Sequence, residues 1–318
     1  MNDDDCAVIR FGDVLLVATT DFVNSHPISI ELGIGSFHTV GRLAVAANLA
    51  DLCGSGAAPK IFLAAVTMPR GTVEDDFITV MEGMREESRR WNVPIAGGDT
   101  KLGTALAIGG AAIGIAVSER NLFLKHRSRP GDLVWASGQL GSCSAAVWGL
   151  AERYGDSHWQ RWAIDTLTVP DLPLSKSRAV SDAELGRGGT DISDGLGMDL
   201  SQLCDCSDLG VVVEADHVPV APEARAFAVD SGLPPWALAF GIGGEFQFLV
   251  TTEARHGDTM NAMGFHLIGE TTSSKDRLLR FPGGRLVDFP TAGHRDVRDL
   301  TFIQETRSLV QAAADVAK

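Results

Sequence analysis

The sequence lacks the long hydrophobic run that a membrane span requires. No segment of about 18 apolar residues occurs among its 318 residues, and a transmembrane helix needs roughly that length. The first residues, MNDDDCAV, also lack the basic-then-apolar order of a secretory signal. We therefore expect a cytoplasmic protein with no membrane partner.

Basic residues are scarce. Lysine and arginine number 27 against 41 aspartates and glutamates, which gives a net charge of −14. Nucleic-acid binding depends on a basic surface that neutralises phosphates, so no nucleic-acid partner is expected. The acidic surplus is compatible with a role in solubility alone, or with carboxylates that hold metal ions.

Cysteine is too rare to build a disulfide framework. The five cysteines are Cys6, Cys53, Cys143, Cys204 and Cys206. Their odd number and irregular spacing favour reduced thiols in a cytoplasm. Cys204 and Cys206 form a C-x-C pair, but a zinc site needs about four ligands and no second pair follows.

The common nucleotide-binding and hydrolase motifs are missing as well. There is no G-x-x-x-x-G-K-[ST] loop, no H-R-D or D-F-G kinase motif, no G-x-S-x-G elbow and no H-E-x-x-H motif. The glycine-rich stretches at 33–35 and 241–244 lack the strand-to-helix context of a dinucleotide site. These absences exclude the familiar P-loop, protein-kinase, serine-hydrolase and zincin interpretations.

The hydrophobic pattern predicts alternating strands and helices in two halves. A chain of this length exceeds one comfortable core, so two domains are expected. Turn residues at 129–132 (RPGD) mark the predicted boundary between residues 1–128 and 129–318. The first half is predicted to contain strands 13–20, 61–68, 93–97 and 104–117 and helices 38–53 and 73–91, the latter started by a Thr72–Asp75 capping box.

The second half shows the same mixture. Its predicted strands are 132–137, 188–192, 209–214, 246–252 and 265–270, and its predicted helices are 143–153, 158–166, 175–185, 196–205, 254–263 and 300–318. This alternation predicts an α/β or α+β fold.

Carboxylates beside Gly, Ser or Thr at strand and helix ends are the most informative feature. They occur at Asp4-Asp5, Thr19-Thr20-Asp21, Asp51, Gly97-Gly98-Asp99-Thr100 and Asp191-Ile192-Ser193-Asp194-Gly195. Each has a purely structural alternative: Asp51 could lie on a solvated helix stripe, Asp194 could cap a helix, and the GGDT segment could be a turn.

Asp51 is the most telling of these residues. Its predicted helix consists largely of Ala, Leu and Val, and a buried unpaired charge costs several kcal/mol. Mg²⁺ binds oxygen ligands, usually a few carboxylates together with substrate phosphates. Several separated Asp segments therefore predict several Mg²⁺ ions that bridge to the phosphates of a nucleotide.

The ordered segments DDCAV, TTDF, NLADLCGSGAAP, GGDT, RPGD, DISDG and GGEFQFLVT resemble the thiamine-monophosphate kinases of the AIR synthase (PurM-like) superfamily. The resemblance covers residues 4 to about 290. It implies two α/β domains, with an N-terminal sheet that forms a barrel across a homodimer and a C-terminal α/β sandwich. ATP and Mg²⁺ would bind at the junction.

By position, the resemblance also implies roles for individual residues. The implied Mg²⁺ ligands are Asp5, Thr19, Thr20, Asp21, Asp51, Asp99, Asp191 and Asp194, of which Asp51, Asp99 and Asp194 are also the catalytic candidates. The implied ATP contacts are Gly98, Asp99, Ser193 and Lys125, which stands where the family has an arginine. Glu245 and His26 would face the phosphoryl acceptor.

The implied reaction is phosphoryl transfer from ATP to thiamine monophosphate. The accepting phosphate oxygen is already ionised, so positioning and charge neutralisation suffice without a general base. The acceptor side departs from the family: Lys101-Leu102 follows GGDT, Phe246 and Gln247 alter the GGED segment, and AGHRD (292–296) replaces an aromatic segment. The family also carries a further segment ahead of its acidic motif. Another ATP-dependent enzyme of the superfamily, with an unknown small acceptor, and a non-catalytic ATP-binding homologue stay as alternatives.

Overall fold

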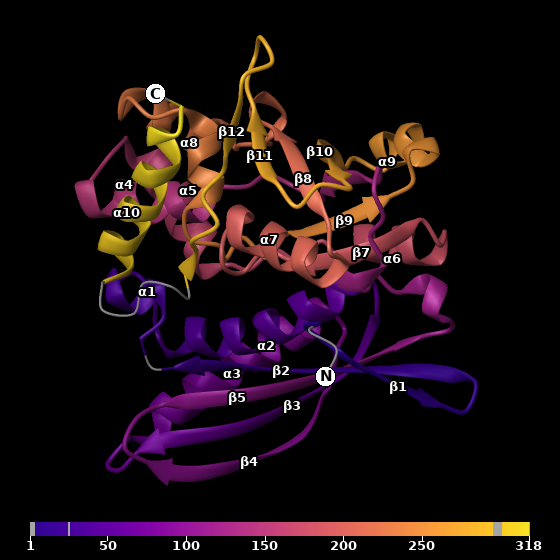
Figure 1. The fold of residues 1–318 in the computed structure, drawn as a ribbon. Coiled ribbons are helices and arrows are strands. Elements are labelled where there is room, and N and C mark those ends of the chain that lie inside the picture. The colour runs from indigo at the N-terminus through magenta and orange to yellow at the C-terminus, as the bar shows by residue number, and fades with distance from the viewer. Residues whose placement is uncertain (1–3, 25, 295–300, 318) are drawn as a thin grey trace.

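A computed structural model describes residues 4–24, 26–294 and 301–317. In this part of the chain the strands form two sheets, which Figure 1 shows as a lower and an upper layer. The lower sheet has the order β1-β2-β5-β3-β4. Its strands are β1 (Ala7–Phe11), β2 (Val14–Asn24), β3 (Ala58–Pro69), β4 (Ile95–Gly103) and β5 (Ala107–Ala116).

The upper sheet comes from the second half of the chain and has the order β12-β11-β8-β10-β6-β9-β7. Its strands are β6 (Leu133–Ala136), β7 (Gly186–Asp191), β8 (Gly210–Glu214), β9 (Phe248–Thr252), β10 (His266–Thr272), β11 (Arg277–Arg280) and β12 (Leu286–Asp288). β7 is therefore an edge strand, and it lies on the side of the upper layer that faces the lower half (Figure 1).

The helix α2 (Phe37–Gly54) lies between the two layers (Figure 1). The other α-helices are α1 (Ile28–Glu31), α3 (Glu74–Arg90), α4 (Ser142–Glu152), α5 (Ser157–Thr168), α6 (Leu174–Asp182), α7 (Leu196–Ser207), α8 (Pro222–Asp230), α9 (Gly257–Ala262) and α10 (Phe302–Asp315). No helix of the described residues is long and apolar enough to cross a membrane.

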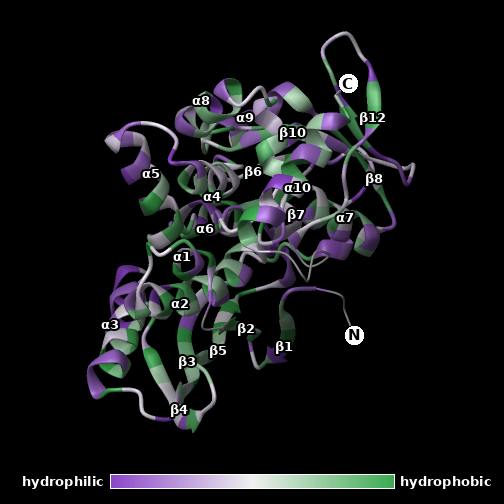
Figure 2. Ribbon diagram, turned by 90° about the vertical axis from the view of Figure 1, so that its left-hand side faces the viewer, coloured by the Kyte–Doolittle hydropathy of each residue, from purple (hydrophilic) through white to green (hydrophobic). Residues whose placement is uncertain are grey.

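Hydrophobic burial explains why α2 occupies this central place. Thirteen of its residues are buried, among them Val40, Leu49 and Leu52, because the helix packs against β2, β3 and β5 on one side and against β7 and β9 on the other. Figure 2 shows green hydrophobic positions along the lower strands, whereas α3 carries mostly purple hydrophilic ones. Burying these apolar side chains provides the main stabilisation of the interface between the halves.

Two glycines let α2 approach its neighbours closely. A Cβ on Gly41 would lie 2.1 Å from the carbonyl oxygen of Val80 on α3. A Cβ on Gly54 would lie 2.5 Å from the backbone nitrogen of Asp191. Because only a residue without a Cβ fits there, the last turn of α2 rests directly on the end of β7. This contact brings the C-terminal turn of α2, with Asp51, next to Asp191.

Most predicted elements are confirmed, with boundary shifts of a few residues. The pattern missed β1, α1, α8, β11 and β12. The predicted capping box at Thr72 is wrong: α3 starts after Val73 without a side-chain cap, and the Thr72 hydroxyl donates to the carbonyl of Pro69. The GGDT segment is not a strand end or a turn, since it lies inside β4. The division into domains at residue 128 stays a prediction.

Candidate active site

A buried lysine and a threonine from the second half of the chain hold the N-terminal acidic segment. Lys125, only 2% exposed, donates from Nζ to Oδ1 of Asp5 at 2.6 Å and from its backbone N–H to Oδ2 of Asp4 at 3.0 Å. Thr190 on β7 donates to the other carboxylate oxygen of Asp5 at 3.1 Å. Burial lowers the pKa of Lys125, but the charge and hydrogen bond of Asp5, with Asp191 and Asp4, outweigh it and raise that pKa. Lys125 thus stays charged and fixes Asp5.

Asp51 and Thr19 form the second part of the site. Thr19, 8% exposed, donates from its hydroxyl to Oδ2 of Asp51 and to the backbone oxygen of Asp5. Burial, with the nearby charges of Asp5 and Asp21, raises the pKa of Asp51 to about 7 despite the hydrogen bond from Thr19. Asp51 therefore faces the cluster of carboxylates, and the solvated-stripe alternative does not describe it.

Asp191 brings the upper sheet into the same cluster. It ends β7 and is 7% exposed. Burial raises its pKa well above the usual value, and the charges of Asp51, Asp5 and Asp199 raise it further. The carboxylates of Asp5 and Asp51, from two other segments, thus lie close enough to disfavour the charged form of Asp191.

The loop after β7 places Ser193 and Asp194 beside this cluster. Asp194 is 4% exposed, and its backbone N–H donates to Oδ2 of the buried Asp199 at 3.2 Å. Asp194 is not the helix cap, because the N-cap of α7 is Gly195 at φ +103°. No motif in the sequence marks Asp199; the signal for it is its position five residues after Asp194, in the first turn of α7.

The oxygen-rich donor set is of the kind that Mg²⁺ prefers. Within the described residues, no group of three or more His, Cys, Asp or Glu side chains is arranged to hold a metal ion by itself. That finding is compatible with Mg²⁺, which usually keeps several waters and takes one or two carboxylates plus substrate phosphates. A divalent cation would relieve the repulsion that raises the pKa values of Asp51 and Asp191.

Two predicted ligands are not brought to this cluster within one chain. Thr20 follows Thr19 on β2, so its side chain lies on the opposite face of the sheet, where its hydroxyl donates to the carbonyl of Gly110 at 2.7 Å. Asp99 lies on β4, separated from β2 by β5 and β3. Its side chain is 65% exposed and pairs with Lys101 at 3.3 Å. Gly98 lies against β3, where a Cβ would be 2.0 Å from the carbonyl oxygen of Ala64.

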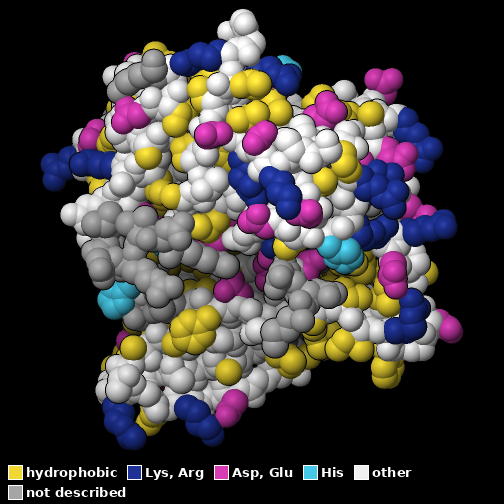
Figure 3. Space-filling model, in the orientation of Figure 1, with side chains coloured by type: hydrophobic (Ala, Val, Ile, Leu, Met, Phe, Trp, Pro, Cys, Tyr) yellow, Lys and Arg dark blue, Asp and Glu magenta, His cyan; other side chains and the backbone are white. Residues whose placement is uncertain are grey.

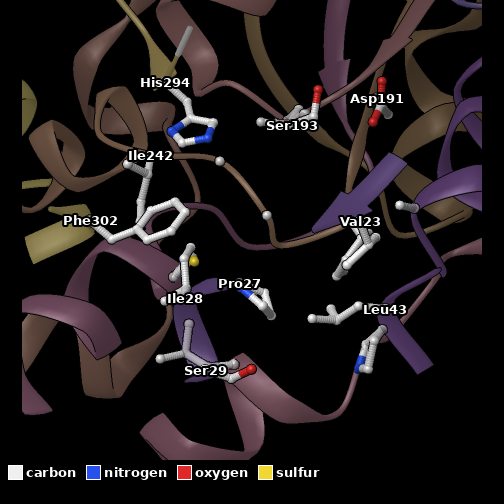
Figure 4. Close-up of a pocket in the computed structure, with 18 of the residues that line it drawn as sticks. Val23, Pro27, Ile28, Ser29, Leu43, Asp191, Ser193, Ile242, His294 and Phe302 are labelled. Atoms are coloured by element: carbon white, nitrogen blue, oxygen red, sulfur yellow. The ribbon is translucent and has the colours of Figure 1, made fainter. Parts of the chain in front are cut away.

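Asp21, Asp191 and Ser193 line a cavity of about 250 Å³. Figure 4 shows Asp191 and Ser193 on one side of it and His294 and Phe302 on another. The walls between them are mainly apolar and include Val23, Pro27, Ile28, Leu43 and Ile242. Figure 3 shows the surface hollowed between the two halves, with acidic side chains beside the hollow.

The two residues predicted to contact the acceptor, Glu245 and His26, differ in their surroundings. Glu245 accepts a hydrogen bond from the backbone N–H of Cys143, in the first turn of α4, at 3.1 Å. Burial raises the pKa of Glu245 to about 7, although the backbone donors around that helix terminus act against it. His26 is exposed, in the segment between β2 and α1, and it is not among the residues that line the cavity.

Residues 3–116 match the family model described as AIR synthase related protein, N-terminal domain. Among curated proteins, the thiamine-monophosphate kinase of Pyrococcus horikoshii is 27% identical, over 78% of this chain and 76% of that protein. That of Halobacterium salinarum is 28% identical, over 90% of this chain and 92% of that protein. These findings confirm the resemblance to the thiamine-monophosphate kinases.

Solved structures confirm the fold. AaThiL complexed with AMPPCP and TMP has a TM-score of 0.79 at 20% identity, covering 92% of this chain and 91% of that one. Hydrogenase maturation protein HypE in complex with ATP has a TM-score of 0.72 at 19% identity, covering 91% and 87%. The chain therefore has the mixed α/β architecture of these AIR synthase-like proteins.

Proposed function

We propose that this chain transfers a phosphoryl group from ATP to thiamine monophosphate, with Mg²⁺, and forms thiamine diphosphate and ADP. It is thus an ATP-dependent phosphotransferase of the thiamine-monophosphate kinase type. The curated relatives named above and the fold shared with AaThiL in its complex with AMPPCP and TMP support this proposal. The observation that carries it is the cluster of Asp5, Asp51 and Asp191 next to a cavity with apolar walls.

The arrangement suits transfer between two phosphates. Asp5, Asp51, Asp191, Asp21 and Asp194 would hold Mg²⁺, which neutralises phosphate charge when bound. Lys125 and Thr190 orient the carboxylate of Asp5, and Thr19 orients that of Asp51. The accepting phosphate oxygen is ionised at neutral pH, so the chain need only position the two substrates and exclude water.

We further propose that the protein acts as a homodimer. The exposed strand β4 and the exposed side chains of Phe22, Leu102 and Val117 leave part of the lower sheet uncovered in one chain. A second copy that covers this sheet would bury them and place its Asp99 near a site other than its own. We expect Leu102→Lys to shift the molar mass measured by light scattering from dimer to monomer and to lower turnover. A dimeric, fully active variant would contradict this arrangement.

A second candidate is ATP-dependent phosphorylation of a different small acceptor by the same site. His294 favours it: its ring lines the cavity, stacks on Phe302 with centroids 5.3 Å apart, and pairs through Nδ1 with Glu305 at 2.9 Å. The fold shared with HypE in complex with ATP fits this candidate equally well. A non-catalytic ATP-binding homologue is the third.

The deciding experiment is incubation with ATP, Mg²⁺ and thiamine monophosphate, followed by chromatography of the products. ADP and thiamine diphosphate in equal amounts support the proposed reaction. ADP that depends on another acceptor supports the second candidate. ATP binding without turnover for any acceptor supports the non-catalytic homologue and contradicts the proposed function.

A further inference from the structure

A second cavity, of about 560 Å³, adjoins the first. Its lining is more polar and includes Gln139, Ser142, Glu245 and Gln247. Three residues line both cavities: Thr166, Pro170 and Phe246. Phe246 is the largest of the three, and it borders both an apolar space beside Asp191 and a polar space beside α4.

The backbone of Phe246 is in a conformation that phenylalanine rarely adopts. Its φ angle is +56°, in the left-handed region, where a side chain with a Cβ costs roughly 1–2 kcal/mol. A bulky residue at such an angle is an outlier that calls for a reason. Packing supplies only part of that reason, because the side chain packs against the hydrophobic cluster of the lower half but is only half-buried.

The neighbours of Phe246 explain how the strained angle is maintained. Glu245, just before it, is bound to the backbone N–H of Cys143. Gln247, just after it, accepts from the backbone N–H of Ile192 at 2.8 Å and, through Oε1, from the hydroxyl of Ser137 at 2.9 Å. The chain is thus fixed on both sides, and Phe246 is held between the two cavities.

We propose that Phe246 is a specificity-determining residue that the acceptor's ring contacts. Its side chain closes the first cavity and keeps the ring out of the second one. The ligand class is a phosphomonoester that carries a flat heteroaromatic ring, with its phosphate toward Asp191 and its ring against Phe246. This inference rests on the proposed function, and it concerns which acceptor is used rather than the transfer itself.

The test compares two acceptors in the full-length protein. One is thiamine monophosphate; the other is its phosphorylated thiazole half, which lacks the pyrimidine ring. For Phe246→Ala we expect the ratio of kcat/KM for the two acceptors to fall roughly tenfold, as loss of an apolar contact in a pocket predicts. The change should lie in KM for thiamine monophosphate, with kcat nearly unchanged. Phe246→Asn should act likewise without strain, since asparagine tolerates this backbone region.

Phe281→Ala, on the turn between β11 and β12, is the matched control and should leave the ratio unchanged. If the wild-type protein forms thiamine diphosphate but neither Phe246 variant alters the ratio, the inference is wrong while the proposed function stands. If the wild-type protein forms none, the proposed function fails, and calorimetric binding of thiamine monophosphate then decides. If Phe246→Ala weakens the binding of thiamine monophosphate about tenfold, the contact between the acceptor and Phe246 is supported. Equal binding by the two proteins, or no binding, overturns the inference.

Discussion

The carboxylate cluster at the end of β7 and the walls of the cavity next to it differ in how their side chains are held. At the carboxylate end, Asp5, Asp51 and the Asp194 backbone each have a fixed partner, in Lys125, Thr19 and Asp199. At the opposite end the walls are mainly apolar. Under the proposed function, the carboxylate end would set the chemistry and the apolar end would select the acceptor.

The largest effect is expected from Asp51→Asn, which removes a charge from the carboxylate end. Turnover of ATP should fall by about 100-fold or more, the scale seen when one group that stabilises transferred charge is lost. The melting temperature should stay the same or rise, because the charged form of Asp51 is disfavoured by burial. Steady-state ADP release and thermal melting measure the two effects.

Asp165→Asn is the matched control for this prediction. Asp165 is an exposed residue on α5, so both turnover and melting temperature should match the wild-type protein. Full activity in the Asp51 variant would mean that this carboxylate takes no part in the reaction.

A pair of neighbouring threonines gives a sharper test of the same end. Thr19→Ala removes the hydroxyl that holds Asp51, and turnover should fall roughly tenfold, as for loss of a supporting contact to a metal ligand. Thr20→Ala removes a hydroxyl bound to Gly110 on the other face of β2, and should change turnover less than about twofold. Equal effects in a parallel kinetic comparison would contradict the separation of the two side chains.

The smallest expected effect is a pH dependence of stability in the absence of metal. Because the folded-state pKa of Asp51 is raised from 3.8 to about 7, the folded protein binds more protons than the unfolded chain between those values. The stability from this group is fully present below pH 3.8 and is lost as pH rises toward about 7. Asp191 acts in the same direction.

Urea unfolding at several pH values measures this slope. With a chelator present, the free energy of unfolding should fall by about 1–3 kcal/mol from pH 5 to pH 8, given about 1.4 kcal/mol per pKa unit. Asp51→Asn should flatten the curve, and added Mg²⁺ should reduce the loss at high pH. A curve with the same slope in the variant would show that another group is responsible.

The sequence was sufficient for the elements whose pattern is local. The apolar run of α2 and the strand-to-helix turn at 191–196 are where the pattern placed them. It was not sufficient where the position depends on sheet order: nothing near Asp99 indicates that β5 and β3 separate it from β2. The Thr72–Asp75 pattern was equally ambiguous, because the same hydroxyl can bond a preceding carbonyl, as it does.

The sequence predicted individual site residues within motifs, but not the hydrogen-bond partners that hold them. Asp194 was proposed from DISDG, but its support by Asp199 depends on the turn that Gly195 makes at φ +103°. Lys125 was placed by resemblance, and its bond to Asp5 spans 120 positions of the chain. No pattern in one sequence encodes such a distant pair, since the contact arises from tertiary packing.

The bonds from Lys125 and Thr190 to Asp5 also constrain the order of events during synthesis. Thr190 is 185 residues from Asp5, so more than half of the polypeptide must emerge from the ribosome before that contact can form. Closing such a long loop is entropically costly and slows folding. The lower sheet can therefore form early, whereas the cluster of Asp5, Asp51 and Asp191 is completed only after β7 has been synthesised.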